Sequence, residues 1–229
     1  MPDRKDVSGT DARLDRAAGD HVSRHYQDYV IRDGKYIGQF EEMYRNSAEI
    51  PWHQDLTVDA VFSDLTVAIL RRRPIHSLLD VGCGYGFMTN RLPTSVPGLR
   101  RVVGLDVSAT AVETARRKFP ELEFRVGTID DVPASERFDA VVSKDVLWYV
   151  LANLTGYLAA LAARSDRYVY VGQSFPERVP FLGDDVLPDA ARLFEVIDAS
   201  CGPIVYSVVE RDAEYGGREY AHAVVEVRR

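Results

Sequence analysis

The amino-acid sequence predicts an α/β protein with a doubly wound sheet of seven strands, covered by helices on both faces. Three observations support this fold class. Strand-like runs alternate with helical runs between residues 76 and 199, a cluster of glycines follows the first strand, and two strand-like runs close the chain. Alternating strands and helices are typical of βαβ units, which build parallel sheets.

The first 55 residues differ in character from the rest of the chain. Residues 1–20 are charged and lack clear periodicity, so we expect a mobile arm there. Residues 21–55 are expected to form a helical, aromatic-rich lid, with short helices around 21–31 and 37–46. Its aromatic residues can line a pocket or simply pack the lid on the sheet, and both alternatives stay open for Tyr26, Tyr29, Tyr36, Phe40 and Tyr44.

Residues 56–229 are expected to form the main domain. One helix is expected at Leu56–Arg72, because its apolar residues mostly share one face and Pro74 follows. The turn residues Tyr215-Gly216-Gly217 separate the last two strands and predict a hairpin, so the last strand should be antiparallel. The strands are expected at His76–Val81, Arg101–Asp106, Glu123–Val126, Phe138–Ser143, Arg167–Gly172, Ile204–Glu210 and Arg218–Val227, and further helices at Ala109–Lys118, Leu151–Ala163 and Asp189–Ala199.

Composition narrows the classes of function. The 229 residues are 46% hydrophobic and carry a net charge of −7, which suits one sizeable core and argues against a nucleic-acid partner. The basic run Arg71-Arg72-Arg73 is interpreted as the end of a helix. Cys83 and Cys201 predict neither a disulfide framework nor a metal site. The polar N-terminus and the absence of an apolar run of about 20 residues predict a soluble, cytoplasmic protein without membrane contact.

The glycine cluster carries the strongest functional signal. Leu78-Leu79-Asp80-Val81-Gly82-Cys83-Gly84-Tyr85-Gly86-Phe87 places glycines at three alternate positions after an acidic strand end. A dinucleotide-binding turn prefers G-x-G-x-x-G, and Phe87 stands where its third glycine would be. The stretch instead resembles motif I of the class I methyltransferases that use S-adenosylmethionine. That resemblance implies a Rossmann-like sheet with an N-terminal helical cap.

Three further stretches extend the resemblance over roughly residues 75–229. Asp106 closes a strand about 20 residues beyond the glycines, where a carboxylate can accept both ribose hydroxyls. The alternative role, a helix N-cap after the strand, suits Ser108 better than Asp106. Thr128 stands where the family usually has an acid facing adenine, so Thr128, Asp130 and Asp131 all stay candidates. The stretch from Phe138 to Tyr149 resembles the family's fourth strand and loop, where cofactor and acceptor meet.

The resemblance therefore implies S-adenosylmethionine as cofactor, no metal, and a set of candidate site residues. For catalysis we expect Asp145, His53 and Tyr149, because a carboxylate or an imidazole can remove a proton from an acceptor. An exposed capping role is the alternative for His53. For cofactor binding the candidates are Tyr44, Trp52, Asp80, Gly82, Cys83, Gly84, Tyr85, Gly86, Asp106, Val107, Thr128, Ile129 and Ser143.

The expected function is methyl transfer to a nitrogen or oxygen atom of a small molecule. Pro51-Trp52 and Leu147-Trp148-Tyr149 resemble stretches of nodulation-factor N-methyltransferases, which suggests an amino sugar or a sugar-containing natural product as acceptor. The alternatives are an aminopropyltransferase-like enzyme and a cofactor-binding subunit without catalysis. The sequence leaves the oligomeric state open, a homodimer included.

Overall fold

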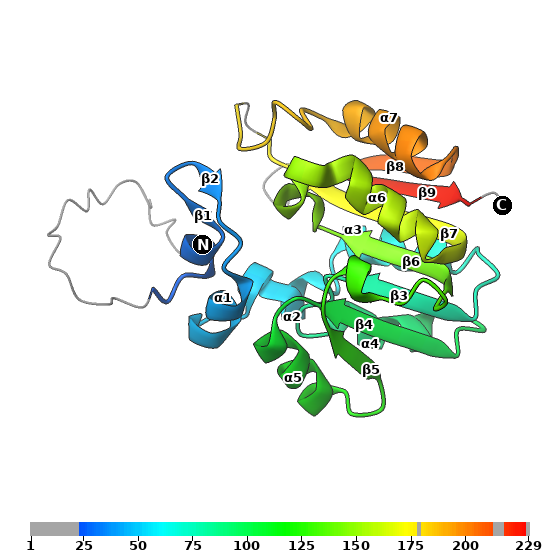
Figure 1. The fold of residues 1–229 in the computed structure, drawn as a ribbon, viewed down its shortest axis with the longest axis horizontal. Helices are drawn as coiled ribbons and strands as arrows, with labels where there is room; N and C mark the ends of the chain where they lie inside the picture. The colour runs from blue at the N-terminus through cyan, green and yellow to red at the C-terminus, as the bar shows by residue number, and fades with distance from the viewer. Residues whose placement is uncertain (1–22, 178–179, 213–217, 228–229) are drawn as a thin grey trace, which may run out of the picture.

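The computed structural model describes residues 23–177, 180–212 and 218–227. The predicted arm at 1–20 and the turn Tyr215-Gly216-Gly217 lie outside these residues. The main sheet has seven strands in the order β5-β4-β3-β6-β7-β9-β8 (Figure 1). Neighbouring strands from β5 to β7 are parallel, and β9 lies between β7 and β8 and is antiparallel to both. The doubly wound sheet and its antiparallel last strand are confirmed.

The strand bounds agree closely with the predicted runs. Along each strand, successive side chains point to opposite faces of the sheet. Leu78 packs with one helical layer and Leu79 with the other, as a period of two requires. The strands are β3 (Ser77–Val81), β4 (Arg101–Asp106), β5 (Glu123–Val126), β6 (Phe138–Lys144), β7 (Ser165–Phe175), β8 (Ile204–Asp212) and β9 (Arg218–Glu226).

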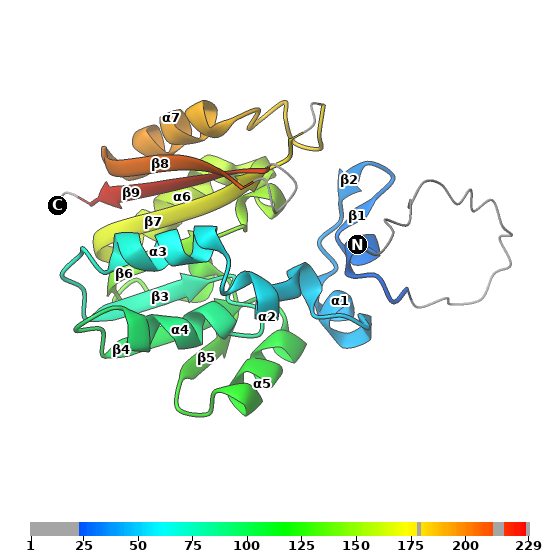
Figure 2. The same ribbon diagram turned by 180° about the vertical axis from the view of Figure 1, so that it is seen from behind.

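Helices cover both faces of the sheet, and Figures 1 and 2 show the two sides. On one face α3 and α4 pack on Leu78, Ala140 and Tyr170. On the other face α6 and α7 pack on Leu79 and Val169. Helix α5 packs on β5 at the sheet edge. The helices of the main domain are α3 (Val61–Leu70), α4 (Phe87–Ser95), α5 (Ala109–Lys118), α6 (Leu154–Ala163) and α7 (Ala190–Cys201), with 3₁₀ turns η3 (Ile129–Asp131), η4 (Leu147–Tyr149) and η5 (Leu151–Asn153).

The first part of the lid was predicted wrongly as a helix at 21–31. It holds a short 3₁₀ turn and a small hairpin, because Asp33 and Gly34 both adopt positive φ. Asp-Gly favours a tight two-residue hairpin turn over a helix. The second predicted helix is present as α1. The lid elements are η1 (Tyr26–Tyr29), β1 (Ile31–Arg32), β2 (Lys35–Tyr36), α1 (Phe40–Asn46), η2 (Pro51–His53) and α2 (Gln54–Thr57).

The single helix expected at Leu56–Arg72 was also wrong. Helix α2 ends at Thr57, Ala60 has extended dihedral angles, and α3 begins at Val61. The Ser63 hydroxyl donates to the Thr57 carbonyl at 2.8 Å, which satisfies one backbone acceptor at the break. This break separates α2, which belongs to the lid, from α3, and α2 lies at the end of the sheet where the parallel strands finish (Figure 2).

Candidate active site

The glycine loop joins β3 to α4 at the carboxyl end of the sheet, where ligands of open α/β sheets bind. Gly82, Gly84 and Gly86 all have φ between +54° and +80°, a region that residues with a Cβ rarely adopt. A Cβ at Gly86 would lie 2.7 Å from the Phe124 ring, so this position is also closed to larger residues. The loop therefore exposes backbone where a side chain would otherwise stand.

Asp106 lies at the end of β4 and is bound to this loop. One of its carboxylate oxygens accepts the Gly84 N–H at 2.8 Å, and the other accepts the Ser108 N–H at 2.9 Å. Burial raises the pKa of Asp106, and these backbone bonds oppose the rise. Each oxygen keeps acceptor capacity for a ligand hydroxyl. The helix cap belongs to Ser108, whose Oγ accepts the Ala111 N–H at 3.1 Å, so Asp106 remains available.

Asp80 precedes the first glycine and is buried. Its carboxylate accepts the Thr89 hydroxyl at 2.6 Å. Burial raises the pKa of Asp80 to about 6, although the Thr89 bond and the charge of Lys144 lower it. A carboxylate that titrates near neutral pH, with one hydrogen bond from protein, can attract a cationic group of a ligand.

The loop after β5 forms the next wall of the site. Thr128 and Asp131 form a capping box. The Asp131 carboxylate accepts the Thr128 N–H at 2.8 Å and the Thr128 hydroxyl at 2.9 Å, so it is committed to Thr128. Thr128, Ile129 and Asp130 line the cavity, and Asp131 does not. Of the three open candidates for an adenine contact, the geometry therefore leaves Thr128 and Asp130.

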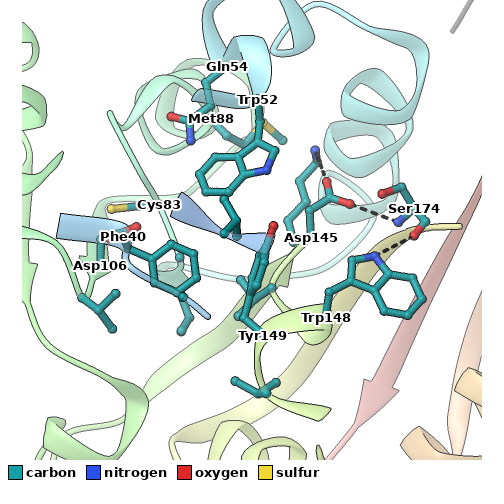
Figure 3. Close-up of a pocket in the computed structure, with 18 of the residues that line it drawn as sticks. Phe40, Trp52, Gln54, Cys83, Met88, Asp106, Asp145, Trp148, Tyr149 and Ser174 are labelled. Atoms are coloured by element: carbon teal, nitrogen blue, oxygen red, sulfur yellow. Dashed lines mark hydrogen bonds and ion pairs between the residues drawn. The ribbon is translucent and has the colours of Figure 1, made fainter. Parts of the chain in front are cut away.

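Aromatic side chains of the lid, together with Tyr149 of η4, surround Trp52 at the carboxyl end of the sheet. Ring centroids lie 5.7 Å from Trp52 for Tyr26, 6.1 Å for Tyr44 and 6.1 Å for Tyr149. Phe40 contacts Tyr149 edge-to-face at 4.9 Å, and Figure 3 shows both rings beside Trp52. Of the five lid aromatics in question, four line the cavity: Tyr26, Tyr36, Phe40 and Tyr44. Tyr29 is buried within the lid, and its hydroxyl donates to the Ser23 carbonyl at 2.7 Å.

Asp145 follows β6 and is held in an unusual conformation. Its φ is +57°, and its carboxylate accepts the Ser174 N–H at 3.0 Å and the Tyr220 hydroxyl at 3.0 Å. The Lys144 ammonium lies 3.4 Å from the same carboxylate. Figure 3 shows Asp145 beside Ser174. A left-handed residue outside glycine costs about 1–3 kcal/mol and persists where its surroundings fix it, often at functional sites.

Lys144 is itself enclosed by aromatic rings. Its ammonium lies 4.3 Å from the Phe62 ring centroid and 5.2 Å from the Tyr220 ring centroid. These two rings stack at 4.8 Å. Cation–π contacts of this kind attract an ammonium group, so these rings and the carboxylate of Asp145 together hold Lys144 in place. Lys144 and Asp145 thus form a fixed pair of opposite charges on the wall of the cavity.

One cavity of about 1460 Å³ joins these features. Pockets for a single small ligand usually measure about 300–1,000 Å³, so this space suits two ligands side by side. It extends from the glycine loop and Asp106, under the lid aromatics, to Asp145 and Tyr220. Glu210 and Arg218 line its far part.

Most of the expected site residues meet at this cavity. Gly84, Tyr85 and Gly86 form the loop behind the wall, and Ser143 is buried with its Oγ 2.8 Å from the Tyr157 hydroxyl. His53 is exposed and lies edge-on to Tyr26, with no side-chain capping bond. The expected residues that line the cavity are Tyr44, Trp52, His53, Asp80, Gly82, Cys83, Asp106, Val107, Thr128, Ile129, Asp145 and Tyr149.

Sequence reasoning missed several residues of the site. Gln54 and Tyr220 bind the expected site residues Tyr85 and Asp145 from segments distant in sequence. Glu41 binds Ser108, and Phe62 contacts Lys144, which are neighbours of the expected residues Val107 and Asp145. Among the described residues no group of three or more His, Cys, Asp and Glu side chains is placed to hold a metal. No helix in the described part of the chain is both long and apolar enough for a bilayer.

Comparison with known proteins finds similarity to methyltransferases over part of the chain. Residues 78–164 match the methyltransferase domain family. The chain is 30% identical over 104 residues to a mitochondrial ubiquinone biosynthesis O-methyltransferase of Candida albicans, covering 42% of this chain and 29% of that protein. It is 39% identical over 66 residues to a trans-aconitate 2-methyltransferase of Paracidovorax citrulli, covering 24% and 25%. The chain thus spans under a third of the length of either relative.

Solved structures of methyltransferases share the fold over most of the chain. A magnesium protoporphyrin IX methyltransferase from Synechocystis with bound S-adenosylhomocysteine superposes with a TM-score of 0.56 at 19% identity, covering 89% of this chain and 93% of that one. The N-methyltransferase NodS from Bradyrhizobium japonicum, also with S-adenosylhomocysteine, gives 0.57 at 16% identity, covering 79% and 95%. At such identities the likeness concerns the fold.

Proposed function

We propose that this chain, which carries a class I S-adenosylmethionine-dependent methyltransferase domain, methylates a nitrogen or oxygen atom of a small molecule. The observation that carries the proposal is the continuous cavity, which runs from the glycine loop and Asp106 to Asp145 beneath an aromatic lid. Its volume accommodates a nucleoside cofactor and an acceptor together. The acidic chain, with a net charge of −7, disfavours nucleic acid as acceptor.

The residues present fit S-adenosylmethionine. Asp106 would offer carboxylate oxygens to the ribose hydroxyls, Asp80 would offer a negative charge to the ammonium group, and Thr128, Ile129 and Asp130 would hold the adenine. The glycine loop brings backbone close to the ligand without a Cβ. When bound, this cofactor supplies an already activated methyl group on a sulfonium.

The residues of this chain then position the two reactants, exclude water from the site and accept a proton from the acceptor. Tight positioning of two reactants is worth about 7–11 kcal/mol. Trp52, Phe40 and Tyr149 enclose the centre of the cavity with apolar surface, which excludes water and favours a cationic sulfonium. Asp145 lies where it can accept a hydrogen bond or a proton from an acceptor amine or hydroxyl, and Tyr220 and Ser174 fix its orientation.

The acceptor class is proposed from the lining of the far part of the cavity. Lys144, Asp145, Glu210 and Arg218 supply both signs of charge beside aromatic rings, a combination that suits a polar, hydroxyl- or amine-bearing acceptor. Amino sugars and sugar-containing natural products belong to this class. The structural likeness to the N-methyltransferase NodS is consistent with it.

Calorimetric titration tests the proposal directly. S-adenosylmethionine and S-adenosylhomocysteine are expected to bind with micromolar affinity, and NAD is expected not to bind. Turnover is then sought with a panel of amino sugars and hydroxylated metabolites. Binding of NAD in place of the two sulfur compounds would overturn the assignment of the glycine loop, and binding without turnover of any acceptor class would favour a non-catalytic subunit.

Cofactor affinity is expected to fall roughly tenfold between about pH 7 and about pH 5. Asp80 has a pKa of about 6, so it is mostly ionised at the upper pH and mostly protonated at the lower, where it no longer attracts the ammonium. Calorimetry with S-adenosylhomocysteine across this range measures the effect. The Asp80→Asn variant should bind weakly with little pH dependence, and an unchanged slope in that variant would assign the titration to another group.

A further inference from the structure

Two polar side chains of the lid reach the loops that surround the proposed cofactor position. Gln54, the first residue of α2, accepts the Tyr85 N–H of the glycine loop through Oε1 at 2.9 Å. Its Nε2 donates to the Tyr44 hydroxyl at 3.1 Å. Tyr44 in turn packs on the Tyr85 ring at 5.0 Å. The carboxamide of Gln54 therefore bridges the lid and the glycine loop.

Gln54 also lies directly on Gly84. A Cβ added at Gly84 would stand 2.5 Å from Gln54 Oε1 and 2.7 Å from its Cδ. Real Cβ atoms do not approach other heavy atoms this closely, so the glycine is needed for the lid side chain to dock. The backbone of Gly84 is the same group that donates to Asp106 at 2.8 Å. Gln54 and Asp106 thus hold neighbouring amides of one loop from two sides.

The chain adopts a costly conformation to present Gln54. Trp52 and His53, the two residues before it, have φ of +54° and +49°. For residues with a Cβ this region costs roughly 1–2 kcal/mol each. Two such residues in succession place Trp52 on the wall of the cavity, where Figure 3 shows it beside Tyr149, and bring Gln54 to the glycine loop. Strain of this kind persists where the surroundings fix it, which points to a functional placement.

Glu41 makes the corresponding connection to the next loop. Its carboxylate accepts the Ser108 hydroxyl at 2.7 Å, the Thr110 N–H at 3.1 Å and the Thr110 hydroxyl at 2.6 Å. These bonds at the N-terminus of α5 lower the pKa of Glu41 to about 2, so it is charged at neutral pH. Ser108 is also the residue whose N–H binds Asp106.

We propose that Gln54 is a positioning residue for cofactor binding: its carboxamide sets the glycine loop in the conformation that receives the cofactor, while Glu41 fixes the adjoining β4–α5 loop. The inference rests on the proposed function, since it assumes that these loops hold the cofactor. The proposal gives the lid a role in cofactor binding, before the acceptor binds. The glycine loop is hydrogen-bonded to Gln54 and the β4–α5 loop to Glu41, and both residues belong to the lid. A merely structural role for Gln54 would change stability and leave affinity unaltered.

The test compares Gln54→Met with Gln39→Met. The first variant keeps the length of the side chain and removes both hydrogen bonds to the loop and to Tyr44. The second makes the same change at an exposed lid residue whose carboxamide accepts only from Arg32. Two quantities are measured: amide hydrogen exchange at Tyr85 in the cofactor-free protein, and affinity for S-adenosylhomocysteine by calorimetry.

Gln54→Met is expected to speed exchange of the Tyr85 amide about tenfold and to weaken S-adenosylhomocysteine binding by about tenfold, with Gln39→Met unchanged in both. Faster exchange with unaltered affinity would overturn the positioning role. Exchange that does not change would show that Gln54 does not hold the loop. If the unaltered protein binds neither S-adenosylmethionine nor S-adenosylhomocysteine, the proposed function fails. Amide exchange at Tyr85 is measured without cofactor, so it still shows whether Gln54 holds the glycine loop.

A double-variant cycle gives a readout that needs no cofactor. Gly84→Ala should lower the melting temperature through its positive φ and its clash with the Gln54 carboxamide. Adding Gln54→Ala removes the clash, so the double variant should be more stable than the sum of the two single losses predicts. Simple additivity would contradict the packing of Gln54 on Gly84.

Discussion

A chain that lacks residues 1–50 is expected to lose at least 100-fold in methyl transfer while its sheet stays folded. The deletion removes Phe40, Tyr44 and Glu41, and with them the aromatic cover of the cavity and the bonds to Ser108 and Thr110. Water exclusion and positioning supply a large share of the catalysis of methyl transfer, and losing part of about 7–11 kcal/mol is sufficient for this effect.

Circular dichroism and thermal denaturation of the truncated chain would check the sheet, and product formation would check turnover. A shorter deletion that ends at residue 22, before the described lid, is the matched control and is expected to keep full activity. Full activity of the chain without residues 1–50 would show that the lid does not take part in catalysis.

The main domain could be predicted from the sequence because its signals are local. The central strands are short, nearly continuous apolar runs, as is typical of strands buried on both faces, and the three alternate glycines follow β3 directly. The two errors arose where a local signal competed with periodicity. Asp33-Gly34 selected a hairpin turn, and the extended Ala60 divided one apolar helical pattern into α2 and α3.

The contacts that organise the site could not be predicted, because they join residues far apart in sequence. Glu41 reaches Thr110 across 69 positions, and Tyr220 reaches Asp145 across 75. A glutamate on a short helix and a tyrosine in an apolar strand have ordinary packing roles in most sequences. Only the topology, which places β9 beside β7, brings Tyr220 to the end of β6.

Replacing Asp106 with alanine is expected to weaken cofactor binding by about 1–3 kcal/mol, or roughly 5- to 150-fold in the dissociation constant. Asp106 is buried at the end of β4, and its two oxygens meet the N–H groups of Gly84 and Ser108. The alanine variant therefore loses both the charged acceptor for the ribose hydroxyls and the bond that orients the glycine loop. Calorimetry with S-adenosylmethionine and S-adenosylhomocysteine measures the loss.

Two further variants separate these contributions. Asp106→Asn keeps the shape and one acceptor oxygen, so it should retain more of the fold than alanine while still binding the cofactor weakly. Asp130→Ala removes an exposed carboxylate that also lines the cavity but makes no contact with the glycine loop, and a smaller effect is expected there. Melting temperatures show which variants are folded. Unaltered affinity in a folded Asp106→Asn or Asp106→Ala protein would contradict the ribose assignment, because the assignment places the ribose hydroxyls on the carboxylate of Asp106 at the end of β4.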